Sequence, residues 1–171
     1  FIHVKAGFEF YLEAIIRNFQ EGVWDESAKY AGCLLHMLED SCFGAHALEG
    51  PFGSDMFILE RLFEAQEDDW EKTPLSILAA LDCSAVEPEK YAPRLLGQSI
   101  PEIVMHLYAA YVEAVNCSRR LCFNIVENVR QNKAQQNADL IRQMAHHTVR
   151  LCADTLFSAW SVATHSFEQT E

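Results

Sequence analysis

The chain has 171 residues, half of them hydrophobic, and carries 13 basic against 25 acidic side chains, for a formal net charge of −12. This length suffices for one domain with a hydrophobic core, and the acidic balance argues against stable nucleic-acid binding, which depends on Lys and Arg at phosphates. No apolar run reaches the length of a transmembrane helix, and none shows the residue order of a signal peptide. Because the first residue is Phe1, we expect a preceding N-terminal segment to be missing from the chain.

Apolar residues recur at helical spacing along most of the sequence, and no stretch alternates as a strand would. The first helix is expected from about His3 to Gln20 and ends at the turn Glu21-Gly22, and Asp25 is expected to cap the second. Further helices are expected after residue 54, over 74–81, from the Ser99–Glu102 capping box to about 131, and from about 137 onward. The sequence therefore predicts an all-α fold, a single domain over residues 1–171 built as a bundle of five to six helices.

One motif within the second helix has the chemistry of a metal site. His36, Asp40 and His46 follow the pattern His-x3-Asp-x5-His. His36 and Asp40 are four residues apart and share one face of a helix, and Gly44 offers a place where the helix stops or bends before His46. Imidazole and carboxylate are ligands that zinc accepts, although a surface hydrogen bond between His36 and Asp40 would explain the same spacing.

This motif resembles the hallmark helix of the zinc-dependent phospholipase C and single-strand nuclease superfamily. The upstream run Lys5-Ala6-Gly7-Phe8-Glu9-Phe10-Tyr11-Leu12 is also similar to that family. The resemblance implies an all-helical, phospholipase C-like fold with one to three Zn²⁺ ions, in which Asp40 bridges two of them. It further implies an extracytoplasmic or secreted location, and it makes His3 the candidate for a zinc ligand that precedes the motif.

The ligand set departs from the family after His46. The family supplies another His with an acidic residue four positions later, whereas this chain has no His between His46 and His106. Glu60 and Glu64 stand at the comparable distance, so they are the candidates for the remaining metal ligands. A carboxylate in place of His is chemically tolerable at zinc, but it weakens the preference for zinc over harder metals.

The function expected from the resemblance is metal-dependent hydrolysis of a phosphoester, with a phospholipid among the candidate substrates and Asp40 as the catalytic carboxylate. The alternative is a catalytically degenerate helical domain that acts by protein contact or within a larger assembly. A nucleophilic role for Cys42, between Asp40 and His46, is a third and weaker interpretation. Two further histidines are expected to differ, with His147 in the core and His146 in solvent.

Overall fold

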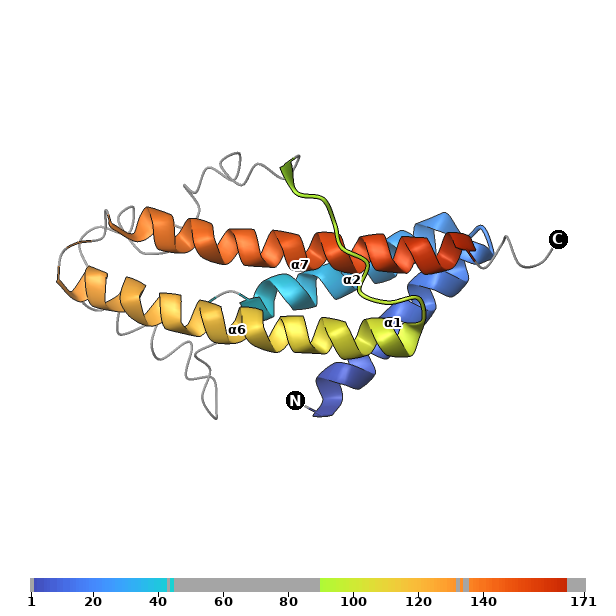
Figure 1. Cartoon of the computed structure of the whole chain (residues 1–171), viewed down its shortest axis with the longest axis horizontal. Coiled ribbons are helices and arrows are strands. Elements are labelled where there is room, and N and C mark those ends of the chain that lie inside the picture. Colours follow the sequence, from blue (N-terminus) through green and yellow to red (C-terminus); the bar gives the residue numbers. More distant parts are fainter. Residues whose placement is uncertain (1, 43, 45–89, 132, 134–135, 166–171) are drawn as a thin grey trace. The chain divides into compact units, whose positions relative to one another are not determined.

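The computed structural model describes residues 2–42, 44, 90–131, 133 and 136–165, and within these ranges it contains helices and no strand. Figure 1 shows these helices. They are α1 (Ile2–Gln20), α2 (Trp24–Cys42), α6 (Ile100–Arg130) and α7 (Asn137–His165). The all-α prediction is confirmed for these residues. The helices expected after residue 54 and over 74–81 lie outside them.

The chain divides into two compact units, and the division falls within α2, α6 and α7. The first comprises residues 1–40, 89–113 and 148–171, and the second comprises 41–88 and 114–147. The first unit has a core of large aliphatic and aromatic side chains. The following members of that core are fully buried: Phe8, Leu12, Leu34, Leu38, Ile103 and Leu107. The ring of Phe8 meets Tyr111 edge-on at 5.4 Å between centroids, so α1 and α6 pack through aromatic contact.

The turn between α1 and α2 is a Schellman motif centred on Gly22. This glycine has φ of 74°, a left-handed conformation that residues with a Cβ rarely adopt. The N–H of Val23 donates to Asn18 O at 2.8 Å, and the N–H of Gly22 donates to Phe19 O at 3.1 Å. The predicted end of the first helix is confirmed. Asp25, expected as the cap of the second helix, instead lies in its first turn, where a carboxylate favours the positive end of the helix dipole.

Residues 90–98, which we call the strap, form an extended segment held against α7 by polar contacts. Its anchor is Asp154, whose carboxylate accepts hydrogen bonds from the hydroxyl of Tyr91 at 2.7 Å and from the backbone N–H of Arg94 at 2.8 Å. The guanidinium of Arg94 adds two bonds to the other carboxylate oxygen, at 3.1 and 3.0 Å. Further along, the N–H of Leu96 donates to Ser158 Oγ at 2.8 Å. These bonds explain how a segment without helical bonds of its own stays ordered.

The strap leads into α6 at the predicted capping box. The helix begins at Ile100, as expected from Ser99 at the cap position and Glu102 three residues later. Glu102 accepts from the N–H of Gln98 at 2.8 Å, one residue before the cap. The side chain thereby satisfies a donor at the end of the strap.

Candidate functional site

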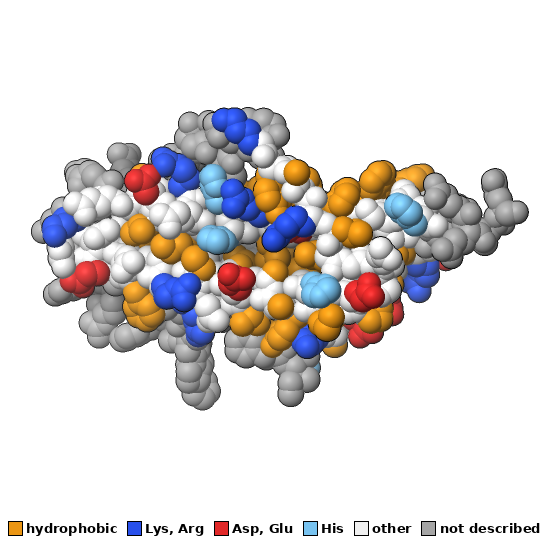
Figure 2. All heavy atoms as spheres, in the orientation of Figure 1, with side chains coloured by type: hydrophobic (Ala, Val, Ile, Leu, Met, Phe, Trp, Pro, Cys, Tyr) orange, Lys and Arg blue, Asp and Glu red, His pale blue; other side chains and the backbone are white. Residues whose placement is uncertain are grey.

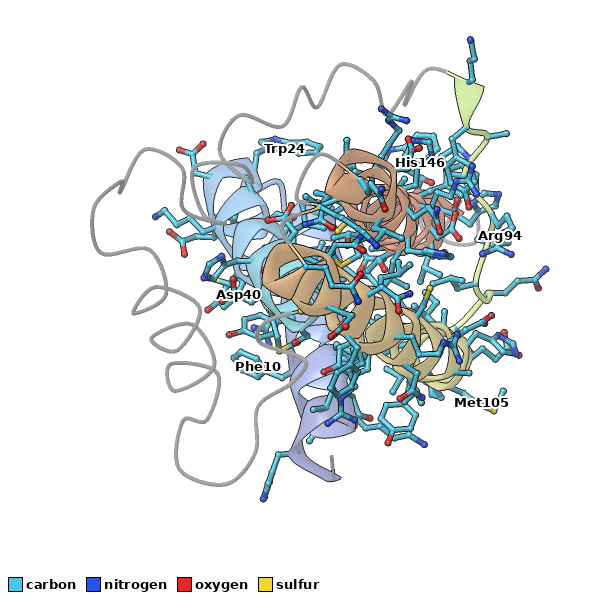
Figure 3. The ribbon with its side chains drawn as sticks, turned by 90° about the vertical axis from the view of Figure 1, so that its left-hand side faces the viewer. Phe10, Trp24, Asp40, Arg94, Met105 and His146 are labelled. Carbon is cyan, nitrogen blue, oxygen red and sulfur yellow. The ribbon has the colours of Figure 1, made fainter. Side chains whose placement is uncertain are left out.

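The first two residues of the predicted metal motif lie together on the surface of α2. His36 Nε2 is 3.4 Å from Asp40 Oδ2, and the two side chains are 75% and 55% exposed. The α-helix brings them together because residues four apart stand one turn above each other. Both donor groups are accessible from solvent, and Figure 3 shows Asp40 on the side of the first unit away from Arg94 and the strap.

The other predicted ligands are not brought to this pair within the described residues. His3 is exposed near the start of α1. His46, Glu60 and Glu64 lie outside the part of the chain that the structure describes. Among the described residues, no group of three or more His, Cys, Asp or Glu side chains is arranged to hold a metal ion. The described candidate site is therefore the pair of His36 and Asp40.

Gly44, two residues before His46, packs closely against its neighbours. It is helical and does not have the positive φ that a glycine at a helix stop commonly adopts. A Cβ at this position would lie 2.6 Å from Cys122 Cβ, 2.9 Å from Met144 Sδ and 2.9 Å from the Ser118 carbonyl oxygen. The absence of a side chain thus allows close packing within the second unit.

Two histidines of α7 have environments opposite to those expected. His147, predicted in the core, is exposed, whereas His146, predicted in solvent, has a buried Nε2 without a hydrogen-bond partner among the described residues. The buried apolar side chains of this part of α7 include Ile141, Met144 and Leu151, and His147 is not buried with them. His106 is hydrogen-bonded through its Nδ1 to the carbonyl of Leu96.

The cysteines divide by burial. Cys42 and Cys122 are buried and Cys33 is exposed, and none of the three is in a disulfide, whereas Cys83 lies outside the described residues. Burial raises the pKa of the Cys122 thiol from 9.0 to about 11, because a thiolate loses its hydration in an apolar environment. A thiol in that state is a poor nucleophile at neutral pH.

The polar cluster around Asp154 was not found from the sequence. Asp154 is 2% exposed and forms an ion pair with Arg94, whose side chain is 72% exposed. The hydrogen bond to Asp154 and burial both raise the pKa of Tyr91, with burial the larger cause. The available signal was a lone Asp within the apolar sequence Leu151–Trp160, where a buried carboxylate requires a partner. All four bonds to this carboxylate come from the strap, so its role is structural.

Comparisons with protein-family models, with curated proteins and with solved structures found no match for this chain. Within the described ranges, none of the helices combines the length and apolarity needed to cross a membrane.

Proposed function

We propose that the protein is a metal-dependent phosphoester hydrolase of the zinc-dependent phospholipase C type. The single observation that carries the proposal is the geometry of His36 and Asp40. Two ligand atoms about 2.0–2.1 Å from a tetrahedral zinc ion stand about 3.3–3.4 Å apart. The separation of 3.4 Å between His36 Nε2 and Asp40 Oδ2 matches that edge without any movement of the helix.

The donor types and their exposure also support the proposal. A neutral imidazole and a carboxylate are suitable zinc ligands, and the exposure of both leaves room for an ion and for substrate. His46, His3, Glu60 and Glu64 are proposed as the further ligands, and Asp40 as the bridge between two ions. The fold-level part of the proposal is a phospholipase C-like bundle of five to six helices.

The chemistry would be hydrolytic. A bound divalent ion lowers the pKa of a coordinated water to near neutrality and stabilises negative charge on a phosphoryl oxygen. The residues of this chain would hold the ion in place. His36 would contribute one ring nitrogen, and Asp40 would contribute a negative charge that offsets part of the charge of the cation.

The test is a pair of substitutions on adjacent residues of α2. Asp40→Asn removes the proposed ligand charge, while Glu39→Gln removes the same charge from the neighbouring exposed position, which points about 100° around the helix. Each full-length protein is dialysed against zinc, and bound metal is measured by elemental analysis. Hydrolysis of bis(p-nitrophenyl) phosphate and of phosphatidylcholine is then followed with and without chelator.

We expect Asp40→Asn to lower zinc affinity by at least the roughly 10–100-fold seen when supporting residues are lost, and to abolish hydrolysis. Glu39→Gln should retain both. Equal zinc content in the wild-type protein and Asp40→Asn would show that Asp40 is only a surface partner of His36.

A second candidate, a non-catalytic helical domain that acts by protein contact, has one observation in its favour. Several large hydrophobic side chains of the described residues are exposed. They include Phe10, Trp24, Met105, Phe123 and Trp160. Exposed apolar surface is typical of binding sites for proteins or membranes. A wild-type chain that takes up no zinc and hydrolyses neither substrate would favour this second candidate.

A further inference from the structure

The C-terminal half of α7 leaves an apolar face in solvent. Trp160 is 53% exposed and Leu156, one turn before it, is 37% exposed. Phe157 is half-buried and lies against Trp160 with ring centroids 6.3 Å apart. Val149 and Ala153 continue the same side of the helix at spacings of three and four residues. The result is a continuous apolar stripe about three turns long.

The core of the first unit is formed by the other side of this helix. The residues of α7 that it buries there include Leu151, Asp154, Thr155, Ser158, Ala159 and Ala163. The apolar stripe is therefore not needed for packing within the unit. Exposing a tryptophan and a leucine one turn apart costs solubility and contributes nothing to this core.

Two arginines border the stripe where the strap meets α7. The guanidinium carbon of Arg150 lies 5.2 Å from the centre of the Tyr91 ring. One side of the helix carries Arg150, Ala153 and Phe157, which are spaced three and four residues apart. The guanidinium of Arg150 therefore lies on the same side of the helix as the ring of Phe157. Arg94 is held nearby through Asp154, and its side chain stays largely exposed despite that contact. In Figure 2 hydrophobic and basic side chains lie next to one another around the strap and this part of α7.

The charge of this surface is opposite to that of the chain. From Thr148 to His165 the one carboxylate is Asp154, which is buried and bound to Arg94, and residues 90–97 contain none. The chain as a whole has a formal net charge of −12. A surface that combines Trp, Phe and Leu with Arg, and whose residues within 90–97 and 148–165 include no exposed carboxylate, is suited to a partner that has negatively charged groups above an apolar layer.

We propose that this surface, formed by Leu156, Phe157, Trp160, Arg94 and Arg150, docks the protein onto anionic phospholipid membranes. The aromatic and aliphatic side chains enter the boundary between headgroups and acyl chains, and the arginines bind lipid phosphates. A second copy of the chain fits the surface less well, because a symmetric contact would bring two such cationic borders together. The proposal concerns attachment and does not depend on hydrolysis.

The test is sedimentation of the full-length protein with lipid vesicles in the presence of chelator, so that metal-dependent hydrolysis does not contribute. Vesicles of phosphatidylcholine alone are compared with mixed vesicles that also contain phosphatidylglycerol. We expect binding to the mixed vesicles, weakening as salt is raised. Trp160→Ala should lower the partition coefficient about tenfold, as expected for loss of roughly half the burial of a large side chain.

The matched control for Trp160 is Trp24→Ala, because Trp24 is equally exposed, at 59%, but begins α2. Arg150→Gln should lower binding to mixed vesicles about fivefold, and Arg17→Gln, an exposed arginine of α1, should leave it unchanged. Circular dichroism verifies that each variant is folded.

The proposal is overturned if the protein binds neither kind of vesicle, or if Trp24→Ala weakens binding as much as Trp160→Ala. A dimer in solution that Trp160→Ala converts to a monomer would assign the surface to a second copy and equally overturn it.

Discussion

Two glycines show how strongly the role of a residue depends on its neighbours. Gly32 lies within α2 with nothing within 4 Å of the position a Cβ would occupy, whereas a Cβ on Gly44 would lie 2.6 Å from Cys122 Cβ. One of the atoms near Gly44 is a backbone oxygen, that of Ser118, which cannot move aside as a flexible side chain can. The same substitution is therefore expected to have opposite effects at the two positions.

Gly44→Ala is expected to lower the free energy of unfolding by about 1–3 kcal/mol, the usual cost of overpacking. Gly32→Ala should raise it by about 0.5–1 kcal/mol, because alanine restricts the unfolded chain and favours helix. Urea unfolding of both variants in chelator measures the two effects without a contribution from metal. A neutral Gly44→Ala would mean that the close packing near Cys122 relaxes at no cost.

Burial of Cys122 predicts a dependence of stability on alkaline pH. Its pKa is raised to about 11 in the folded protein from 9.0, so between these values the folded state retains a proton that the unfolded chain has lost. Stability from this group is fully present below about pH 9 and is lost as pH rises toward 11. Cys122→Ala should show a shallower decline of melting temperature over this range, whereas exposed Cys33→Ala should follow the wild-type slope.

At the scale of elements, the strap illustrates an ordered segment without regular hydrogen bonding. Tyr91, Arg94 and Leu96 reach α7 across 60 to 63 residues of sequence through bonds to Asp154 and Ser158. Asp154 receives four hydrogen bonds from two residues, so its charge is compensated although its side chain is buried. The attachment of the strap should therefore depend on this one carboxylate.

Asp154→Asn is expected to destabilise the fold by about 1–3 kcal/mol, because the amide nitrogen would meet the guanidinium donors of Arg94 and leave them unpaired. Amide hydrogen exchange should accelerate at the N–H groups of Arg94 and Leu96 before it does in the core of α1. The control is Asp139→Asn, which removes an exposed carboxylate of the same helix paired with Arg142 at 2.6 Å. That change should stay within about 0.5 kcal/mol of wild type.

At the scale of the whole molecule, the proposed metal site predicts that stability depends on zinc. An ion that binds only the folded state at a concentration 100 times its Kd adds about 2.7 kcal/mol to the free energy of unfolding. We expect zinc to raise the melting temperature of the wild-type protein, and chelator to reverse the rise. Asp40→Asn should melt at the same temperature with and without zinc.

The least supported of the proposed ligands has its own test. Glu64→Gln should reduce the zinc-dependent rise in melting temperature if Glu64 completes a metal site, and should leave the rise unchanged if it does not. Glu9→Gln, an exposed carboxylate of α1, controls for the change in net charge. A full zinc response in Glu64→Gln would remove this residue from the ligand set.

The sequence alone predicted the helical class and several helix ends, because these depend on local signals. Gly22 ended the first helix as expected, and Ser99 with Glu102 marked the start of α6. The proximity of His36 and Asp40 could also be predicted, since the helix repeat brings residues four apart together wherever a helix forms.

Tertiary structure decided which of these local features are buried and which segments meet. The attachment of the strap, the burial of Asp154 and the different environments of His146 and His147 depend on contacts between segments distant in sequence. The role of Gly44 depends likewise on Cys122, Met144 and Ser118. Periodicity along one helix reports an apolar side but not the neighbour that covers it, because burial is a property of two surfaces and a sequence pattern describes only one of them.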